Sequence, residues 1–196
     1  MKYVKMKEEK LVALCKKQKS SAQKEVYNLY APLLRGVCRR YVIDFDNAED
    51  VLQEGFFRVF MYIEKFTWNG NGSLFYWSKR IMINTAINYL RKHSKKIQEE
   101  PISEKHEYSI SDNSDDFFSS EAKYSQDDIR KAFEKVSDQF RVVLNLYIID
   151  GMKHKEIAEM LEIPEETSRS RLGRGKKMLR DLLIQIHENK TENIYR

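Results

Sequence analysis

Glycine, proline and cysteine are all scarce in this chain of 196 residues, which has seven, three and two of them respectively. So few turn-forming residues exclude both a Gly- and Pro-rich disordered protein and a β fold with many tight turns. The length excludes a large multidomain enzyme and allows one or two compact domains. Because 33% of the residues are charged and 41% are hydrophobic, the composition favours amphipathic helices, and we expect an all-α protein.

Metal-binding and disulfide patterns are also missing. Cys15 and Cys38 lie in different segments, with no CxxC motif and no histidine at ligand spacing. We therefore expect no disulfide framework, no metal site and no cofactor. No apolar run approaches the roughly 18 to 20 residues that a membrane span requires, and residues 1–10 lead into no signal-type apolar core. We expect a soluble protein of the cytoplasm.

The net charge of +5 conceals a strong segregation of charge along the chain. Residues 1–97 carry a net charge of +10, residues 98–128 carry −8 and residues 129–196 carry +3. The acidic stretch has no helical or strand periodicity and is rich in Ser, Asp and Glu, which is typical of a flexible linker. A second interpretation stays open, in which this strip mimics phosphate charge and occupies a basic groove when nucleic acid is absent.

An amphipathic helix is predicted between Asn47 and Lys65. Its apolar residues recur at helical spacing, at positions Leu52, Phe56, Val59, Phe60 and Ile63. Asp46 or Asn47 is expected to cap its start. The opposite face mixes polar and apolar side chains, at positions Asp50, Gln53, Glu54, Phe57 and Met61. Such a face suits a protein partner, and an ordinary solvated surface is the alternative.

A loop rich in aromatics and a second helix follow. Gly70 and Gly72 interrupt the helical pattern, and a helix over residues 73–96 ends in several cations. One stripe of this helix contains Trp77, Ile81, Asn84 and Asn88. Aromatic rings, amides and cations together equip a protein to hold single-stranded nucleic acid. The alternatives are that Trp77 belongs to the core and that Asn84 is a helix-packing amide.

The second basic unit contains the pattern of a helix-turn-helix. The segment MKHKEIAEMLEIPEETSRSRLGRGKKML predicts a helix, a tight turn at Glu162 and Ile163, and a second helix that Pro164 begins. From Arg169 to Arg180 the second helix carries six cations and no acid. This density indicates a DNA recognition helix, with a solvated basic helix as the alternative.

These segments, in this order, resemble the extracytoplasmic-function (ECF) class of bacterial RNA polymerase sigma factors. NAEDVLQEGFFRVF is similar to that family's region 2.2, WSKRIMINTAINYLRK to regions 2.3 and 2.4, and KEIAEMLEIPEETSRSRLGRGKKML to region 4.2. The resemblance implies two small helical domains, one like sigma region 2 and one like the helix-turn-helix of region 4, joined by a flexible acidic linker. The expected order is an N-terminal helical extension, the region 2-like domain, the linker, the region 4-like domain and a tail, at residues 1–23, 24–97, 98–128, 129–185 and 186–196.

The resemblance also implies three binding surfaces. The surface expected to face the β′ clamp helices of the polymerase consists of Asp50, Gln53, Glu54 and Phe57. The expected contacts to the minus-ten promoter element are Trp68, Asn69, Asn71, Trp77, Asn84, Asn88, Arg91 and Lys92. The loop at residues 66–73 falls where the family captures a flipped base. The expected contacts to the minus-thirty-five element are Thr167, Ser168, Arg169, Arg171, Arg174 and Lys177.

Four positions of the second unit depart from the family's pattern. Family members usually have glycine where Glu162 and Glu166 stand, a small aliphatic residue where Ser168 stands, and a Ser or Thr cap near Lys153. We expect the turn to need a positive φ at Glu162, which strains a residue with a side chain.

The implied function is transcription initiation. Its implied partners are core RNA polymerase, through the β′ clamp helices and the β flap, promoter DNA and an anti-sigma factor. No clustered carboxylates, nucleophile with its base or metal quartet points to catalysis. We therefore expect no enzyme and no small-molecule substrate, and we interpret the four histidines as surface residues. The alternative is a stand-alone helix-turn-helix regulator that binds duplex DNA as a dimer.

Overall fold

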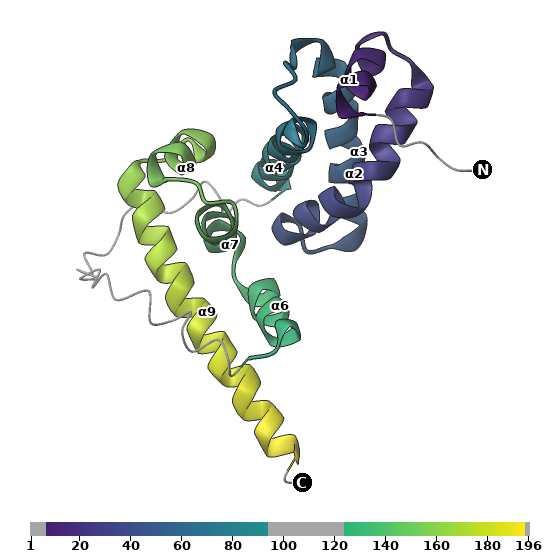
Figure 1. Cartoon of the computed structure of the whole chain (residues 1–196). Coiled ribbons are helices and arrows are strands. Elements are labelled where there is room, and N and C mark those ends of the chain that lie inside the picture. The colour runs from purple at the N-terminus through teal and green to yellow at the C-terminus, as the bar shows by residue number, and fades with distance from the viewer. Residues whose placement is uncertain (1–6, 94–123, 195–196) are drawn as a thin grey trace. The chain divides into compact units, whose positions relative to one another are not determined.

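The chain divides after His93 into two compact units, and both are helical over their described residues (Figure 1). The computed structural model describes residues 7–93 and 124–194, and over these residues all regular structure is helical. The expected all-α fold class is confirmed. Most of the predicted acidic linker lies outside the described residues. In the part of the chain that is described, no helix is both long enough and apolar enough to cross a membrane.

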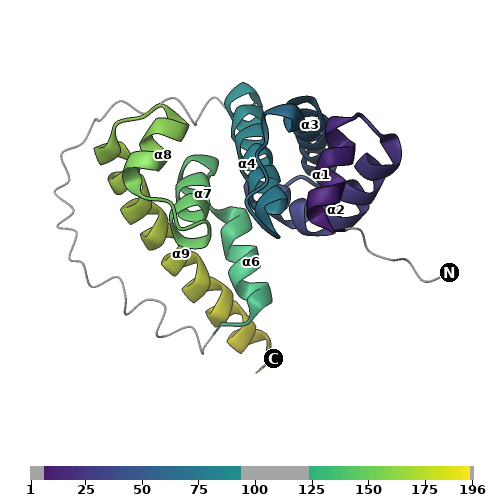
Figure 2. The ribbon, with the colours of Figure 1, turned by 45° about the horizontal axis from the view of Figure 1, so that its top comes forward.

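The first unit contains four α-helices among its described residues. Its elements are α1 (Glu8–Lys16), α2 (Ser20–Tyr41), α3 (Phe45–Tyr62), the short 3-10 helix η1 (Ile63–Lys65) and α4 (Ser73–His93). The helices α2, α3 and α4 pack against one another in all three pairs, and α1 packs on α2 and η1 (Figure 2). The core of this unit therefore lies between α2, α3 and α4.

The helix α3 has the predicted buried face and a different cap. Leu52 and Val59 of that face, and Ile63 at the start of η1, are at most 1% exposed. The helix begins at Phe45, because the extended Asp44 accepts a hydrogen bond from the backbone N–H of Asn47 at 2.9 Å. The prediction that Asp46 or Asn47 is the cap is wrong.

The first described helix, α1, belongs to the core of the first unit. The helix α1 buries Leu11, Val12 and Cys15 against its neighbours. The expected boundary at residue 24 falls inside α2, which begins at Ser20. The segment from α1 onward is thus an integral part of this unit and differs from the expected extension.

The crossing of α3 over α4 depends on a glycine. A Cβ atom added at Gly55 would lie 2.1 Å from the Met82 sulfur and 2.9 Å from its terminal methyl carbon. Both residues are buried, and Met82 is 0% exposed. The side chain of Met82 fills the space that a larger residue at position 55 would need.

The second unit packs three shorter helices on one long helix. Its described elements are α6 (Gln126–Lys135), α7 (Asp138–Leu144), the π-helix η4 (Asn145–Ile149), α8 (His154–Leu161) and α9 (Glu165–Ile194). Each of α6, α7 and α8 contacts α9 (Figure 1). Leu172, Leu179 and Leu183 of α9 are buried in these contacts.

Both ends of this unit extend beyond the expected boundaries. Ser125 and Asp128 form a capping box that begins α6, so the last residues of the range 98–128 are structured. At the other end α9 continues through the expected tail to Ile194. The Lys190 ammonium lies 2.5 Å from an Asp128 carboxylate oxygen and holds the pKa of that carboxyl at about 2. This ion pair ties the end of α9 to the start of α6.

The turn between α8 and α9 has the predicted strain. Glu162 adopts the left-handed conformation, with φ 56° and ψ 43°. The backbone N–H of Ile163 donates to the carbonyl of Ala158 at 3.1 Å and closes the turn. A residue with a Cβ atom is unfavourable in this conformation, where glycine is the usual choice.

Gly55→Ala should destabilise the first unit, although alanine is the better helix former. Overpacking costs about 1–3 kcal/mol, and the helix preference returns about 1 kcal/mol. The matched control is Gly36→Ala in α2, because an added Cβ atom there meets nothing within 4 Å. That control should raise the free energy of unfolding by about 0.5–1 kcal/mol. Both tryptophans lie in this unit, so their fluorescence in urea reports on it. Equal stabilisation by both substitutions would contradict the close approach of α3 and α4.

Glu162→Gly should stabilise the second unit. The left-handed conformation costs a residue with a side chain about 1–2 kcal/mol, and glycine relieves this strain. Part of the stabilisation is lost, because glycine has greater conformational freedom in the unfolded chain. We expect a net gain of about 0.5–1 kcal/mol. The control is Glu159→Gly, an exposed position within α8, which should cost about 1 kcal/mol. Hydrogen exchange of the α8 amides measures the stability change in both variants. A loss of protection in Glu162→Gly would show that the turn is not strained.

Candidate polymerase and nucleic-acid interfaces

The outward face of α3 combines acids with large apolar side chains. Asp50, Gln53, Glu54 and Phe57 are all exposed. Phe57 is 62% exposed and Met61, one turn further along, is 49% exposed. Glu54 accepts a hydrogen bond from Arg58 Nε at 2.7 Å, on the same helix. The structure thus brings the four predicted residues together on one exposed helical face that a protein partner could cover.

Residues 66–72 form the loop before α4, and two glycines shape it. Gly70 has φ 109° and Gly72 has φ 89°, values that disfavour any other residue. Asn69 and Asn71 are exposed, and Trp68 is half-buried. The Trp68 indole N–H is shielded from solvent and has no hydrogen-bond partner among the described residues. The loop thus presents two exposed amides beside an aromatic ring.

A carboxylate from the opposite end of the first unit's sequence holds this loop. The Glu8 carboxylate of α1 accepts hydrogen bonds from the backbone N–H of Gly72 at 2.8 Å and of Leu74 at 3.0 Å. It also accepts from the hydroxyls of Ser73 at 3.3 Å and Tyr30 at 2.9 Å. Burial by itself raises the pKa of Glu8, but these four hydrogen bonds outweigh it and lower the pKa below its ordinary value.

Sequence reasoning missed Glu8 because 64 residues separate it from Gly72. The one local feature of the sequence that points to an acceptor from elsewhere is the lack of an acidic residue in the first turn of α4. The first N–H groups of a helix need acceptors, and a negative charge is favourable there. Glu8 meets both needs from a different helix.

The predicted stripe of α4 lies beside the buried face of that helix. Trp77 is half-buried, and its ring centroid lies 4.9 Å from that of Phe66. Asn84 is exposed, so the alternative of a helix-packing amide is wrong. Asn88 is half-buried and accepts a hydrogen bond of 3.5 Å from Arg91. With Lys92 exposed as well, the C-terminal half of α4 presents amides and cations to solvent.

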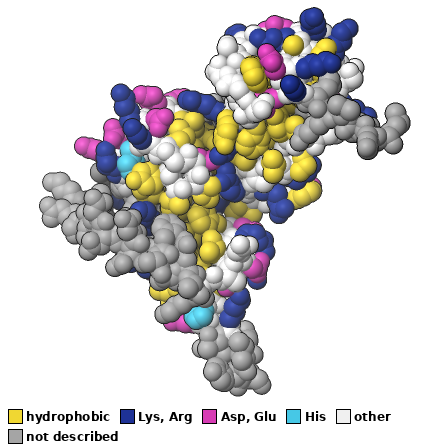
Figure 3. Space-filling view, in the orientation of Figure 1, with side chains coloured by type: hydrophobic (Ala, Val, Ile, Leu, Met, Phe, Trp, Pro, Cys, Tyr) yellow, Lys and Arg dark blue, Asp and Glu magenta, His cyan; other side chains and the backbone are white. Residues whose placement is uncertain are grey.

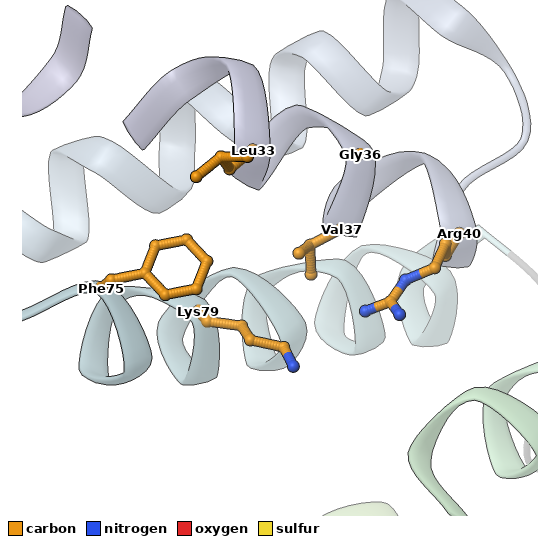
Figure 4. A pocket seen from close by; sticks show the side chains of 6 residues that line it. All are labelled: Leu33, Gly36, Val37, Arg40, Phe75 and Lys79. Carbon is orange, nitrogen blue, oxygen red and sulfur yellow. The ribbon is translucent and has the colours of Figure 1, made fainter. Parts of the chain in front are cut away.

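A shallow groove between α2 and α4 was not predicted. Its volume is about 370 Å³, and its lining residues are Leu33, Gly36, Val37, Arg40, Phe75 and Lys79. In Figure 4 the apolar side chains form one end of the groove, while the Arg40 guanidinium and the Lys79 ammonium point into the other end. On the face of the first unit drawn in Figure 3, exposed hydrophobic side chains have Lys and Arg side chains among their neighbours. The groove suits a ligand with a planar or apolar part and a negative charge.

On α9 the structure separates the predicted DNA contacts into two groups. Arg169 and Lys177 are exposed, and Thr167 and Arg174 are half-buried. Ser168 is 0% exposed and Arg171 is 7% exposed. We correct the prediction for Ser168 and Arg171, because the face of α9 that packs on the rest of the unit contains them.

The buried Ser168 has a partner that also corrects the interpretation of a histidine. The Ser168 hydroxyl lies 2.9 Å from His154 Nδ1, and the His154 ring stacks on Tyr147 at 4.8 Å between centroids. Burial, helped by the nearby Arg169, lowers the pKa of His154. His154 is therefore a half-buried packing residue of the helix-turn-helix, and the prediction of a surface histidine is wrong at this position.

Within the described ranges, no group of three or more His, Cys, Asp or Glu side chains has the arrangement of a metal site. The described residues offer three surfaces: the outward face of α3, the loop and groove around α4, and the exposed cations of α9. Aromatic, amide and cationic groups of this kind bind macromolecules by stacking, hydrogen bonding and charge.

Comparisons with known proteins match both units to one family. A model of sigma-70 region 2 matches residues 26–96, and a model of sigma-70 region 4 matches residues 126–179. The ECF RNA polymerase sigma-E factor of Haemophilus influenzae is 26% identical over 166 residues, which cover 80% of this chain and 86% of the relative. The ECF RNA polymerase sigma factor SigW of Bacillus subtilis is 27% identical over 194 residues, which cover 90% of this chain and 97% of the relative.

A solved structure shares the fold. The sigma factor RpoE of Bartonella quintana, crystallised in complex with the anti-sigma factor NepR, matches 82% of this chain and 95% of its own with a TM-score of 0.51 and 21% identity. The two family models together span well over half of the chain, in the order region 2 then region 4. With relatives of the ECF class matched over most of their length, the chain belongs to the sigma-70 family and is an ECF-class RNA polymerase sigma factor.

Proposed function

We propose that this chain binds core RNA polymerase and directs it to promoters, with each helical unit contacting a different promoter element. The observation that carries the proposal is the match of sigma-70 region 2 and region 4, in order, to two separate helical units. We take the DNA-binding domains to be α1 to α4 and α6 to α9. The chain acts as a binding factor rather than an enzyme, and it acts in the cytoplasm, where promoter DNA and polymerase meet.

The polymerase-binding surface in this proposal is the outward face of α3. Asp50, Gln53, Glu54 and Phe57 share one exposed face, and Phe57 provides a large apolar side chain at its C-terminal end. Exposed aromatic residues ringed by polar groups are frequent anchors of protein interfaces. This face is our candidate contact for the β′ clamp helices, while the β flap is the proposed contact of the second unit.

The minus-ten element is the proposed ligand of the loop at residues 66–73 and of α4. Trp68, Asn69 and Asn71 offer an aromatic ring and two exposed amides for an unpaired base. Along α4 the proposed contacts are Trp77, Asn84, Asn88, Arg91 and Lys92. The neighbouring groove adds Arg40 and Lys79, which supply positive charge for the phosphate backbone.

The minus-thirty-five element is the proposed ligand of α9. The revised set of contacts is Thr167, Arg169, Arg174 and Lys177, with the buried Ser168 and Arg171 left out. The helix begins immediately after the tight turn at Glu162, as the second helix of a helix-turn-helix does. In that motif the N-terminal residues of the second helix contact base edges in the major groove.

Energetics require both units to act on one polymerase. A good base contact favours the correct base over a wrong one by about 1–3 kcal/mol, so a single small DNA-binding domain has limited sequence specificity. Opening duplex DNA costs about 1.4 kcal/mol per base-pair step, whereas stacking one extruded base returns about 1–3 kcal/mol. The polymerase must therefore supply most of the contacts that keep the bubble open. The family match favours this function over a stand-alone regulator that binds as a dimer.

We also propose that an anti-sigma factor regulates this chain. The support is the related RpoE, whose structure is that of a complex with the anti-sigma factor NepR. Such a partner would act by covering one of the three surfaces described above.

Run-off transcription with purified core polymerase and a promoter library tests the proposed function. We expect specific transcripts only when this chain is added. Phe57→Ala should lower their yield at least tenfold, because truncating an aromatic residue that is a hot spot of an interface costs about 2 kcal/mol or more. The matched control is Ile184→Ala, an apolar residue of α9 with 41% exposure, which should leave the yield unchanged. Identical transcripts with and without the chain would refute the proposal.

Lys177→Ala should weaken binding of the holoenzyme to promoter DNA by a similar factor for every sequence. An exposed lysine that contacts phosphate contributes charge without base readout. The slope of log Kd against log salt concentration should therefore fall by about one. Lys131→Ala, an exposed lysine of α6 that pairs with Asp127 at 2.7 Å, is the control and should change neither quantity. An unchanged salt dependence for Lys177→Ala would remove this lysine from the interface.

A further inference from the structure

The Glu8 carboxylate of α1 accepts four hydrogen bonds, three of them from the junction between the loop and α4. One carboxylate oxygen accepts from Gly72 N–H at 2.8 Å and from the Tyr30 hydroxyl at 2.9 Å. The other accepts from Leu74 N–H at 3.0 Å and from the Ser73 hydroxyl at 3.3 Å. One side chain of α1 therefore fixes three consecutive residues at the junction of the loop and α4.

The end of the loop that contains the two glycines has few other means of holding its shape. Gly70 and Gly72 both have positive φ, and glycine loses more conformational freedom on ordering than any other residue. Within the loop, Ser73 N–H donates to the Gly70 carbonyl at 3.2 Å, and Asn69 N–H donates to the Ser73 hydroxyl at 3.3 Å. Both bonds end on Ser73, which Glu8 itself holds. The aromatic residues Phe66 and Trp68 hold the start of the loop by packing, whereas the order of its glycine-containing end depends on the carboxylate.

A second chain of contacts connects Glu8 with the groove between α2 and α4. Tyr30 is 7% exposed, so its hydrogen bond to Glu8 is sheltered from water. The Tyr30 ring packs edge-on against Phe75 at 5.5 Å between centroids. Phe75 lines the groove. The same carboxylate therefore positions the amides of the loop and one wall of the groove.

We propose that Glu8 is a positioning residue for promoter opening, which holds the loop at residues 66–73 in the conformation that receives an unpaired base. The proposal rests on the proposed function, in which this loop captures a base of the minus-ten element. It also extends that function to α1, which lies outside the residues 26–96 that match sigma-70 region 2. Glu8 acts through the loop and does not itself touch DNA.

The variant that tests the proposal is Glu8→Gln, with Glu9→Gln as its matched control. Glutamine has nearly the shape of glutamate, but it lacks the charge and replaces one acceptor oxygen with a donor amide that would face N–H and O–H donors. Glu9 is adjacent and exposed, so its substitution makes the same change in net charge. Thermal unfolding followed by tryptophan fluorescence shows whether each variant keeps the first unit folded.

The first measurement is hydrogen exchange in the full-length protein. The amides of Gly72 and Leu74 should exchange about tenfold faster in Glu8→Gln, because charge-assisted hydrogen bonds are lost. Amides of α3 and of the second unit should be unaffected, as should all amides in Glu9→Gln. Tyr30→Phe provides a milder second variant, since it keeps the ring against Phe75 and removes one hydrogen bond to Glu8. Unchanged exchange at Gly72 and Leu74 in Glu8→Gln would overturn the anchoring on which the proposal depends.

The second measurement is open-complex formation by the holoenzyme on promoters with single abasic sites in the non-template strand. A scan with the wild-type chain finds the position at which removal of a base slows opening. On the intact promoter, Glu8→Gln should form open complexes about tenfold more slowly than wild type. On the promoter with the abasic site at that position, the two chains should differ by less than twofold, because there is no base for the loop to receive. A residue that merely stabilised the fold would slow both promoters equally.

The outcomes separate the inference from the proposed function. If no abasic position slows the wild-type chain, the loop captures no base and the proposed function of the loop fails. If such a position exists but Glu8→Gln behaves as Glu9→Gln does, base capture stands and the role of Glu8 is refuted. An equal defect of Glu8→Gln on intact and abasic promoters would likewise refute a positioning role.

Discussion

In each unit one long helix must both bury an apolar stripe and expose the groups that bind a partner. On α4 the buried stripe includes Met82 and Ala86, while Asn84 and Lys92 face solvent. On α9 it includes Leu172 and Leu179, while Arg169 and Lys177 face solvent. Because a helix is rigid, the packing of the stripe also fixes where every neighbouring side chain points. The placement of the proposed DNA contacts is thus a consequence of how the two cores are filled.

The same constraint explains which α9 residues could not be assigned from the sequence. Cation density from Arg169 to Arg180 predicted a binding helix, but it carries no information about which side of the helix faces the core. Gly175 lies on the side of α9 that faces the core, since an added Cβ atom there would lie 3.1 Å from Leu144. Ser168 falls on the same side seven residues earlier and is buried with it. A small polar residue in a basic segment is therefore ambiguous until the packing of the helix is known.

Local signals predicted much of the first unit, and long-range contacts account for what was missed. The apolar period predicted the buried face of α3, and the glycines predicted the break before α4. The start of α3 was misplaced by the choice between neighbouring acidic and amide residues, of which Asp44 forms the cap. No periodicity could connect Glu8 with Gly72 or Asp128 with Lys190, because each pair joins elements that lie far apart in the sequence. Such pairs are set by the tertiary fold alone.

The balance of energies gives a physical reason for holding the loop in place before DNA arrives. Stacking one extruded base returns about 1–3 kcal/mol, and fixing the backbone of one residue costs about 1–2 kcal/mol. A loop with two glycines that became ordered only on binding would lose the whole gain from stacking. The hydrogen bonds from Gly72, Ser73 and Leu74 to Glu8 impose that order in the folded protein itself. Base capture then competes only with the cost of opening the duplex, which the polymerase shares.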